Sequence, residues 1–87
     1  MDLTVEFNQA VNKVQQLTAR PANDELLKLY GLFKQATEGD NNTPRPGGFD
    51  FKAMAKFDSW ANHKGKTRDE AMKDYIDFVA TLLSKYA

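Results

Sequence analysis

Apolar residues recur along the chain at the three- and four-residue spacing of an α-helix, and this pattern predicts four helical segments. The first begins after Asp2 or Thr4, since either side chain can cap a helix, and it is closed by Arg20 and Pro21. The apolar positions of this segment are Phe7, Ala10, Val11, Val14 and Leu17.

The second segment begins at Asn23, a cap candidate followed by two acids that suit a helix N-terminus, and ends near Gly39. Its apolar residues surround most of the helix, which is more than one packing face requires. They are Leu26, Leu27, Leu29, Tyr30, Leu32, Phe33 and Ala36. Residues 38–48 are dense in turn formers and are therefore predicted to form a loop.

Two more segments follow this loop. Asp50 is expected to cap a short third helix that stops at Lys64 and Gly65, and Thr67 with Glu70 forms a capping box for the fourth. Because no stretch shows the two-residue period of a strand, we predict an all-α domain of four helices over residues 1–87. The spacing leaves the order of packing open, because the loop of roughly eleven residues allows a connection between helices that are not neighbours.

The composition excludes several classes of protein. Among 87 residues, 12 Lys and Arg balance 12 Asp and Glu, whereas a general nucleic-acid binder is expected to carry a basic excess. The absence of cysteine excludes a disulfide scaffold and a thiol nucleophile and suits a reducing compartment. No apolar run reaches the roughly 18 residues of a membrane span, and the first residues do not resemble a signal peptide. We expect a cytoplasmic protein that does not insert stably into a membrane.

Catalytic or metal chemistry has little support in the sequence. His63 is the only histidine and has no cysteine to join it in a metal site. The acid pairs Asp24–Glu25 and Asp69–Glu70 each fall in the first turn of a predicted helix, where the helix dipole explains them. No nucleotide-binding or hydrolase motif is present. We therefore expect neither an enzyme nor a metal site.

Binding of an anion has better support. Tyr30 and Lys34 lie one helical turn apart beside Phe33, so a phenol and an ammonium could hold a phosphate while the ring stacks on a base. A core tyrosine and a solvated lysine would show the same spacing. Residues 52–68 carry five basic residues against one acidic residue, which suits a compact polyanion or an ordinary solvated helix face.

Two runs of residues carry a recognisable motif: residues 30–40 read YGLFKQATEGD, and residues 55–60 read AKFDSW. The first run is similar to the signature Y-x-x-[YF]-K-Q-A-T-x-G-D of the acyl-CoA-binding protein family, and the second to the A-K-W-D-A-W of that family, so the sequence resembles this family. The similarity continues through residues 42–47 and into the last segment, and it covers essentially the whole chain.

The resemblance implies an up-down-down-up four-helix bundle that binds and transports one long-chain acyl-CoA ester per chain, as a monomer without a cofactor. It implies that Tyr30, Lys34 and Lys56 hold the 3′-phosphate and that Phe33 flanks the adenine. The ligand-binding positions that it implies are Gln15, Tyr30, Gly31, Leu32, Phe33, Lys34, Lys52, Lys56 and Tyr75. The implied acyl groove is lined by Phe7, Ala10, Leu26, Leu27, Leu29 and Ala55.

The sequence departs from the family pattern at a few positions. Gln15 stands where the family often has lysine, and Phe33 and Phe57 stand in place of a tyrosine and a tryptophan. Gly31 lies inside a predicted helix, where glycine costs about 1 kcal/mol relative to alanine. The alternatives are a helical protein-interaction module without a small ligand, and a binder of membrane surfaces or nucleic acid through residues 52–68.

Overall fold

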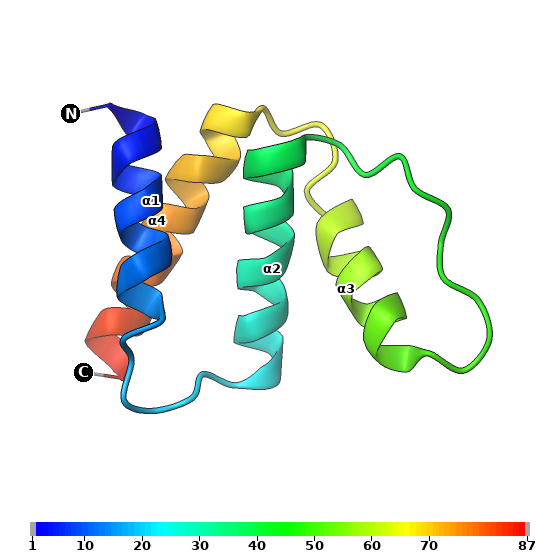
Figure 1. Ribbon diagram of the computed structural model, residues 1–87, viewed down its shortest axis with the longest axis horizontal. Helices are drawn as coiled ribbons and strands as arrows, with labels where there is room; N and C mark the ends of the chain where they lie inside the picture. Colours follow the sequence, from blue (N-terminus) through cyan, green and yellow to red (C-terminus); the bar gives the residue numbers. More distant parts are fainter. Residues whose placement is uncertain (1, 87) are drawn as a thin grey trace.

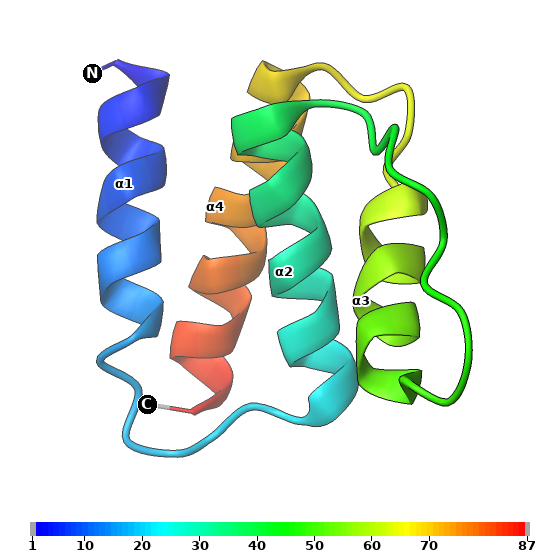
Figure 2. The same ribbon diagram turned by 45° about the vertical axis from the view of Figure 1, so that its right-hand side comes forward.

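The computed structural model describes residues 2–86, in which four α-helices and no strand occur. The helices are α1 Leu3–Val14, α2 Asn23–Glu38, α3 Phe51–Ala61 and α4 Arg68–Lys85. In Figures 1 and 2, α1 and α4 run in one direction and α2 and α3 in the other. A long loop returns the chain from the end of α2 to the start of α3, so these two helices are parallel. The predicted all-α, up-down-down-up bundle is confirmed.

The beginnings of three helices are those that the sequence predicts. The Asp2 and Asp50 carboxylates each accept a hydrogen bond from a backbone amide of the first turn, at 2.9 and 3.0 Å. Thr67 and Glu70 bond reciprocally, with each side chain accepting from the other residue's backbone amide at 3.0 Å. These bonds satisfy donors that the first turn of a helix otherwise leaves free.

The predicted cap of the second helix is wrong. The N-cap is Ala22 and not Asn23, which already belongs to α2. A methyl group cannot accept a hydrogen bond, so the cap depends on Glu25, whose Oε1 accepts from the Ala22 amide at 2.9 Å. This is the glutamate half of a capping box without its hydroxyl half.

Two helices end earlier than their apolar patterns suggest. Helix α1 ends at Val14, after which Leu17 donates to the Val14 carbonyl in a tighter turn and packs against the core from outside the helix. Helix α3 ends at Ala61, and residues 62–65 form turns that finish at Gly65 with φ 94°. The spacing of apolar residues indicates which residues face the core, whereas a helix is defined by its backbone hydrogen bonds, so the two can end at different residues.

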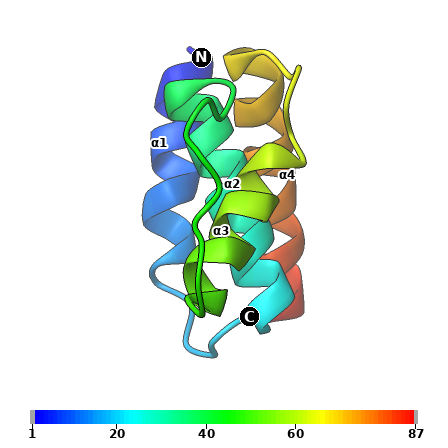
Figure 3. The same cartoon turned by 90° about the vertical axis from the view of Figure 1, so that its right-hand side faces the viewer.

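The core lies between α1, α2 and α4. Its buried residues are Phe7, Ala10, Leu29, Leu32, Ala36, Ala71, Tyr75, Val79 and Leu82. Helix α3 supplies none of them and packs against α2 alone among the helices (Figure 3). Its main anchor is Trp60, which is buried and donates through Nε1 to the Gly39 carbonyl at 2.8 Å. One side of α2 therefore packs in the core while another side faces α3.

Gly31 sets the distance between α2 and α3. A Cβ at this position would lie 2.3 Å from the Ser59 carbonyl oxygen and 3.1 Å from His63 Cδ2. The missing side chain thus leaves room for the backbone of α3, and this close approach accounts for a glycine in the middle of a helix.

A hydrogen-bond network around the buried Gln35 joins the two connections of α3. Gln35 is fully buried, and its Nε2 donates to Asp40 Oδ1 at 2.9 Å and to the Lys66 carbonyl at 2.8 Å. Asp40 also accepts from the Gly65 amide at 2.9 Å. The Gly65 amide and then the Gln35 amide lower the pKa of the Asp40 carboxyl, so the charged form of Asp40 holds the network at neutral pH.

Candidate ligand-binding site

A groove of about 470 Å³ lies between the first half of α2 and the first half of α3. We call it the α2–α3 groove. Helix α2 presents side chains at positions i, i+3, i+4 and i+7, and α3 at i, i+3 and i+4, so one face of each helix lines it. Its lining residues are Arg20, Asn23, Leu26, Leu27, Tyr30, Lys52, Ala55 and Lys56. Aliphatic side chains and cations therefore share one open groove.

Two cation–aromatic contacts follow each other along α2 and α3. Lys56 Nζ lies 5.3 Å from the centre of the Tyr30 ring, and Lys34 Nζ lies 4.9 Å from the centre of the Trp60 ring. Lys34 is one turn beyond Tyr30 on α2, and Trp60 is one turn beyond Lys56 on α3. The phenol and the two ammonium groups that the sequence singles out are therefore neighbours along one helix–helix contact.

Tyr30 and Lys56 also line a second, smaller cavity of about 230 Å³ beside the α2–α3 groove. Its other walls are α3 and the loop over residues 41–46. Arg45 fixes this loop to α3 by two hydrogen bonds to the Asp58 carboxylate, at 3.0 and 3.2 Å. The Arg45 guanidinium lowers the pKa of Asp58, so this acid stays charged and is paired with a cation outside residues 52–68.

Lys34 has an acidic partner in the free protein. Its ammonium donates to the Glu38 carboxylate one turn along α2, and its side chain is 24% exposed. An anion that approaches Lys34 therefore competes with Glu38 for the same donor.

Phe33 belongs to an aromatic cluster formed by α1, α2 and α4. Its ring centre lies 5.9 Å from that of Phe7 and 6.4 Å from that of Tyr75. Phe7 and Tyr75 meet edge to face at 5.0 Å and are buried, whereas Phe33 is 37% exposed. Burial raises the pKa of the Tyr75 phenol, which stays neutral at physiological pH. The cluster thus supports one accessible ring, next to Lys34 in the chain.

Comparisons with known proteins agree with this geometry. The family model described as Acyl CoA binding protein matches residues 4–79. The chain belongs to the acyl-CoA-binding protein family. It is 51% identical to an acyl-CoA-binding protein homolog of Drosophila melanogaster over 94% of this chain and 95% of the relative. It is also 51% identical to the acyl-CoA-binding protein of Brassica napus, over 100% of this chain and 95% of the relative.

A solved structure of the same family shares the fold. The crystal structure of acyl-CoA-binding protein 2 from Oryza sativa superposes with a TM-score of 0.92 at 43% identity. The match covers 97% of this chain and 93% of the other.

The structure separates the acyl-groove residues expected from the family resemblance into two sets. Leu26, Leu27 and Ala55 line the α2–α3 groove and are half-buried. The other three are buried core residues: Phe7, Ala10 and Leu29. A helix can be apolar at a position because it meets another helix or because it meets a ligand, and the sequence pattern does not distinguish these cases.

Six of the expected ligand contacts are not among the residues that line the groove. Phe33 and Tyr75 belong to the aromatic cluster, and Lys34 lies one turn beyond Tyr30 on α2. Gly31 faces the backbone of Ser59, and Leu32 has no exposed surface. Gln15 caps the C-terminus of α1 and is exposed, but it is not among the residues that line the groove. Gly31 and Leu32 therefore shape the protein around the groove instead of presenting a surface to it.

Two groove residues were missed by the sequence analysis. Arg20 and Asn23 both line the α2–α3 groove, and Arg20 Nη1 donates to Asn23 Oδ1 at 3.3 Å. The sequence signal for them was their position at the start of the helix whose apolar face is wider than packing requires. Arg20 and Asn23 therefore place polar groups at the end of the groove, where they can contact a ligand bound along the apolar face of α2.

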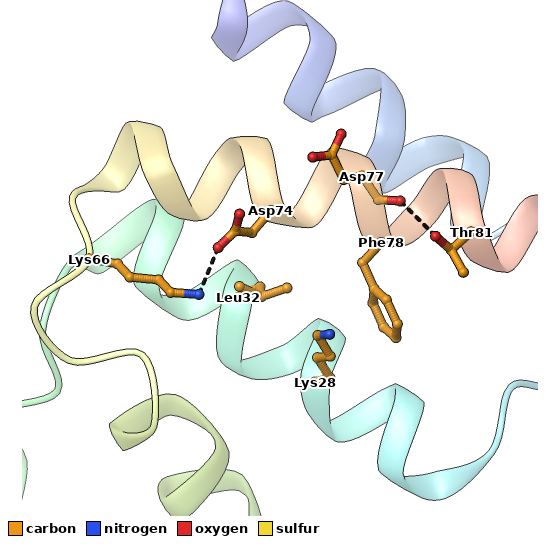
Figure 4. A pocket seen from close by; sticks show the side chains of 7 residues that line it. All are labelled: Lys28, Leu32, Lys66, Asp74, Asp77, Phe78 and Thr81. Carbon is orange, nitrogen blue, oxygen red and sulfur yellow. Dashed lines mark hydrogen bonds and ion pairs between the residues drawn. The ribbon is translucent and has the colours of Figure 1, made fainter.

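Another hollow, of about 380 Å³, lies away from the α2–α3 groove, between α2 and α4 (Figure 4). Two carboxylates, Asp74 and Asp77, line this hollow, and Asp74 already pairs with Lys66 at 2.7 Å. None of the expected phosphate-holding residues lines it. It is therefore a poorer candidate for an anionic ligand than the α2–α3 groove.

Residues 2–86 contain no group of three or more side chains placed to hold a metal ion. Within the same range, no helix is both long enough and apolar enough to cross a bilayer.

His63 is partly buried against α2, and this burial lowers its pKa, so the imidazole is mainly neutral at pH 7.

Proposed function

We propose that this protein binds an acyl-CoA ester in the α2–α3 groove, holds it without chemical change and so buffers and transports it. One observation carries the proposal: Tyr30 and Lys56 line the same groove as Leu26, Leu27 and Ala55. A ligand for such a groove needs both an anionic group and a long apolar chain. Membership of the acyl-CoA-binding protein family names a ligand of this kind.

The anionic end of the ligand meets the two cation–aromatic pairs. A phosphate monoester carries about −1.5 to −2 charges at neutral pH and has three acceptor oxygens. Lys34, Lys56 and the Tyr30 hydroxyl supply two charges and several donors within two turns of α2 and α3. We assign the 3′-phosphate of CoA to these three groups and the adenine to the exposed face of Phe33.

The acyl chain lies along the aliphatic side chains of the groove. Burial of one methylene contributes about 0.8 kcal/mol, so a dozen methylenes contribute about 10 kcal/mol before the costs of ordering the chain. Affinity should therefore rise with chain length until the chain outgrows the groove.

The α2–α3 groove combines aliphatic walls with Arg20, Lys52 and Lys56, which have no ion pair among residues 2–86, and we assign one ligand to each chain. We also propose that the protein works as a monomer in the cytoplasm. The lack of cysteine suits a reducing compartment, and the balanced charge weighs against nucleic acid as a partner.

Substitution of Lys34 tests the assignment of the head group. Lys34→Ala removes a charge-assisted bond to the phosphate and should weaken palmitoyl-CoA binding at least about tenfold, measured by calorimetry. Lys73→Ala is the matched control, because Lys73 is an exposed lysine of α4, which packs against α1 and α2 and not against α3. Equal affinities for the two variants would contradict the assignment. A protein-interaction module would give no saturable heat with palmitoyl-CoA in any variant.

A further inference from the structure

Phe49 and Phe51 are the most exposed large apolar side chains among residues 2–86. Phe49 is 91% exposed and Phe51 is 71% exposed, whereas Val5 is 45% exposed. Phenylalanine is ordinarily one of the most buried residue types, so two exposed rings in one short segment mark a surface for interaction.

A tight backbone turn joins Phe49 to Phe51. The Phe51 amide donates to the Phe49 carbonyl at 3.0 Å across Asp50, whose φ of −83° and ψ of 78° are those of an inverse γ-turn. The Asp50 carboxylate is occupied as the cap of α3, where it accepts from the Ala53 amide at 3.0 Å. We call residues 49–51 the phenyl turn. Its charge faces the helix, and its rings face solvent.

The phenyl turn continues the surface of the α2–α3 groove. Phe51 precedes the groove residue Ala55 by one helical turn and lies beside the end of the groove, but it is not among the residues that line it. In Figures 1 and 2 the first turns of α2 and α3 lie at the same end of the bundle. Arg20 and Lys52 line the groove and have no ion pair among residues 2–86. Two exposed rings and two unpaired cations therefore belong to one region of the surface.

We infer that the phenyl turn docks into the interface of an anionic lipid bilayer and brings the end of the α2–α3 groove to the membrane. Aromatic rings enter the boundary between head groups and acyl chains, and lysine and arginine face the lipid phosphates. No helix spans the bilayer in this arrangement, and contact is reversible. The inference rests on the proposed function in one respect: the acyl chain of the ligand partitions into bilayers, so a groove that opens there can load and unload without exposing the chain to water.

Flotation with vesicles tests the docking. The protein with and without palmitoyl-CoA is mixed with vesicles of phosphatidylcholine alone or of phosphatidylcholine with phosphatidylserine. We expect the protein to float with the anionic vesicles and the partition coefficient of the double variant Phe49→Ser, Phe51→Ser to fall by roughly tenfold or more. Val5→Ser is the matched control and should partition as the unsubstituted protein does. Both phenyl substitutions remove exposed rings, so neither opens a cavity in the core.

Calorimetry with palmitoyl-CoA in the absence of vesicles separates the possible results. Unchanged affinity of the double variant, together with its lost flotation, supports docking. A loss of affinity without vesicles means that the rings cover the ligand, and it overturns the inference. Equal flotation of the double variant and the unsubstituted protein, or no flotation of the latter with anionic vesicles, also overturns it. If the unsubstituted protein does not bind palmitoyl-CoA, the proposed function fails, while flotation still decides whether the phenyl turn docks.

Discussion

Gly31→Ala is the substitution that most directly tests how the α2–α3 groove is built. The new methyl carbon would lie 2.3 Å from the Ser59 carbonyl oxygen, whereas ordinary contacts begin at 3.4 Å. Ser59 presents backbone at this point, and backbone cannot rotate out of the way as a flexible side chain can. Helix α3 must therefore move away from α2 by about 1 Å at the contact.

Two opposing effects set how much Gly31→Ala changes the free energy of unfolding. Alanine is a better helix former than glycine by about 1 kcal/mol. Overpacking of a close helix contact costs about 1–3 kcal/mol, and a backbone obstacle puts this site at the upper end of that range. We expect a net loss of about 2 kcal/mol in the free energy of unfolding, measured in urea.

The same displacement should weaken ligand binding. Tyr30 and Lys56 face each other across the contact that Gly31 permits, so separation of the helices moves apart two groups assigned to one phosphate. We expect a loss of roughly tenfold in palmitoyl-CoA affinity by calorimetry. Gly47→Ala is the matched control, because its new methyl group would have no neighbour within 4 Å and its φ is not positive. A Gly31→Ala protein as stable as the Gly47→Ala control and with unaltered affinity would refute the reasoning.

Two acids allow further tests. Glu38→Gln frees Lys34 from its carboxylate partner and should raise palmitoyl-CoA affinity about two- to fivefold, because exposed ion pairs contribute about 0.2–1 kcal/mol; weaker binding in calorimetry would contradict this. The Tyr86 hydroxyl, Lys85 and a backbone amide lower the pKa of Glu25 from 4.5 to about 2. A carboxyl whose pKa is lower in the folded state stabilises the protein fully above pH 4.5 and loses this effect as the pH falls to about 2. The stability difference between the unsubstituted protein and Glu25→Gln in urea should therefore shrink over that range, and a difference independent of pH would count against the assignment.

The sequence predicts the helices well because their signals are local. Asp50 and Thr67 bond to amides within one turn, so their residue types and spacing alone identify the helix starts. The cap at Ala22 was not predictable in this way, since its only capping bond comes from Glu25 reaching back. The end of α1 was predicted too late because Leu17 packs against the core from a turn, whereas α2 ends next to Gly39 as predicted.

The site was only partly predictable because apolar spacing does not say what covers a residue. Leu29 and Leu26 look alike in the sequence, yet the first is a core residue and the second lines the groove. Gly31 lies in the family signature, and its role becomes visible only when α3 is placed against it. Gln35, in the same signature, joins two loops through a contact 31 residues apart, and no local pattern shows such a contact.

Titration of the unsubstituted protein with palmitoyl-CoA in a calorimeter tests the central claim most directly, because the claim is that one groove holds both the phosphate and the acyl chain. The predicted result is saturable binding with one ligand per chain, and much weaker binding of both acetyl-CoA, which lacks the long chain, and palmitate, which lacks the phosphate. Palmitoyl-CoA binding no tighter than that of either partial ligand would contradict the claim.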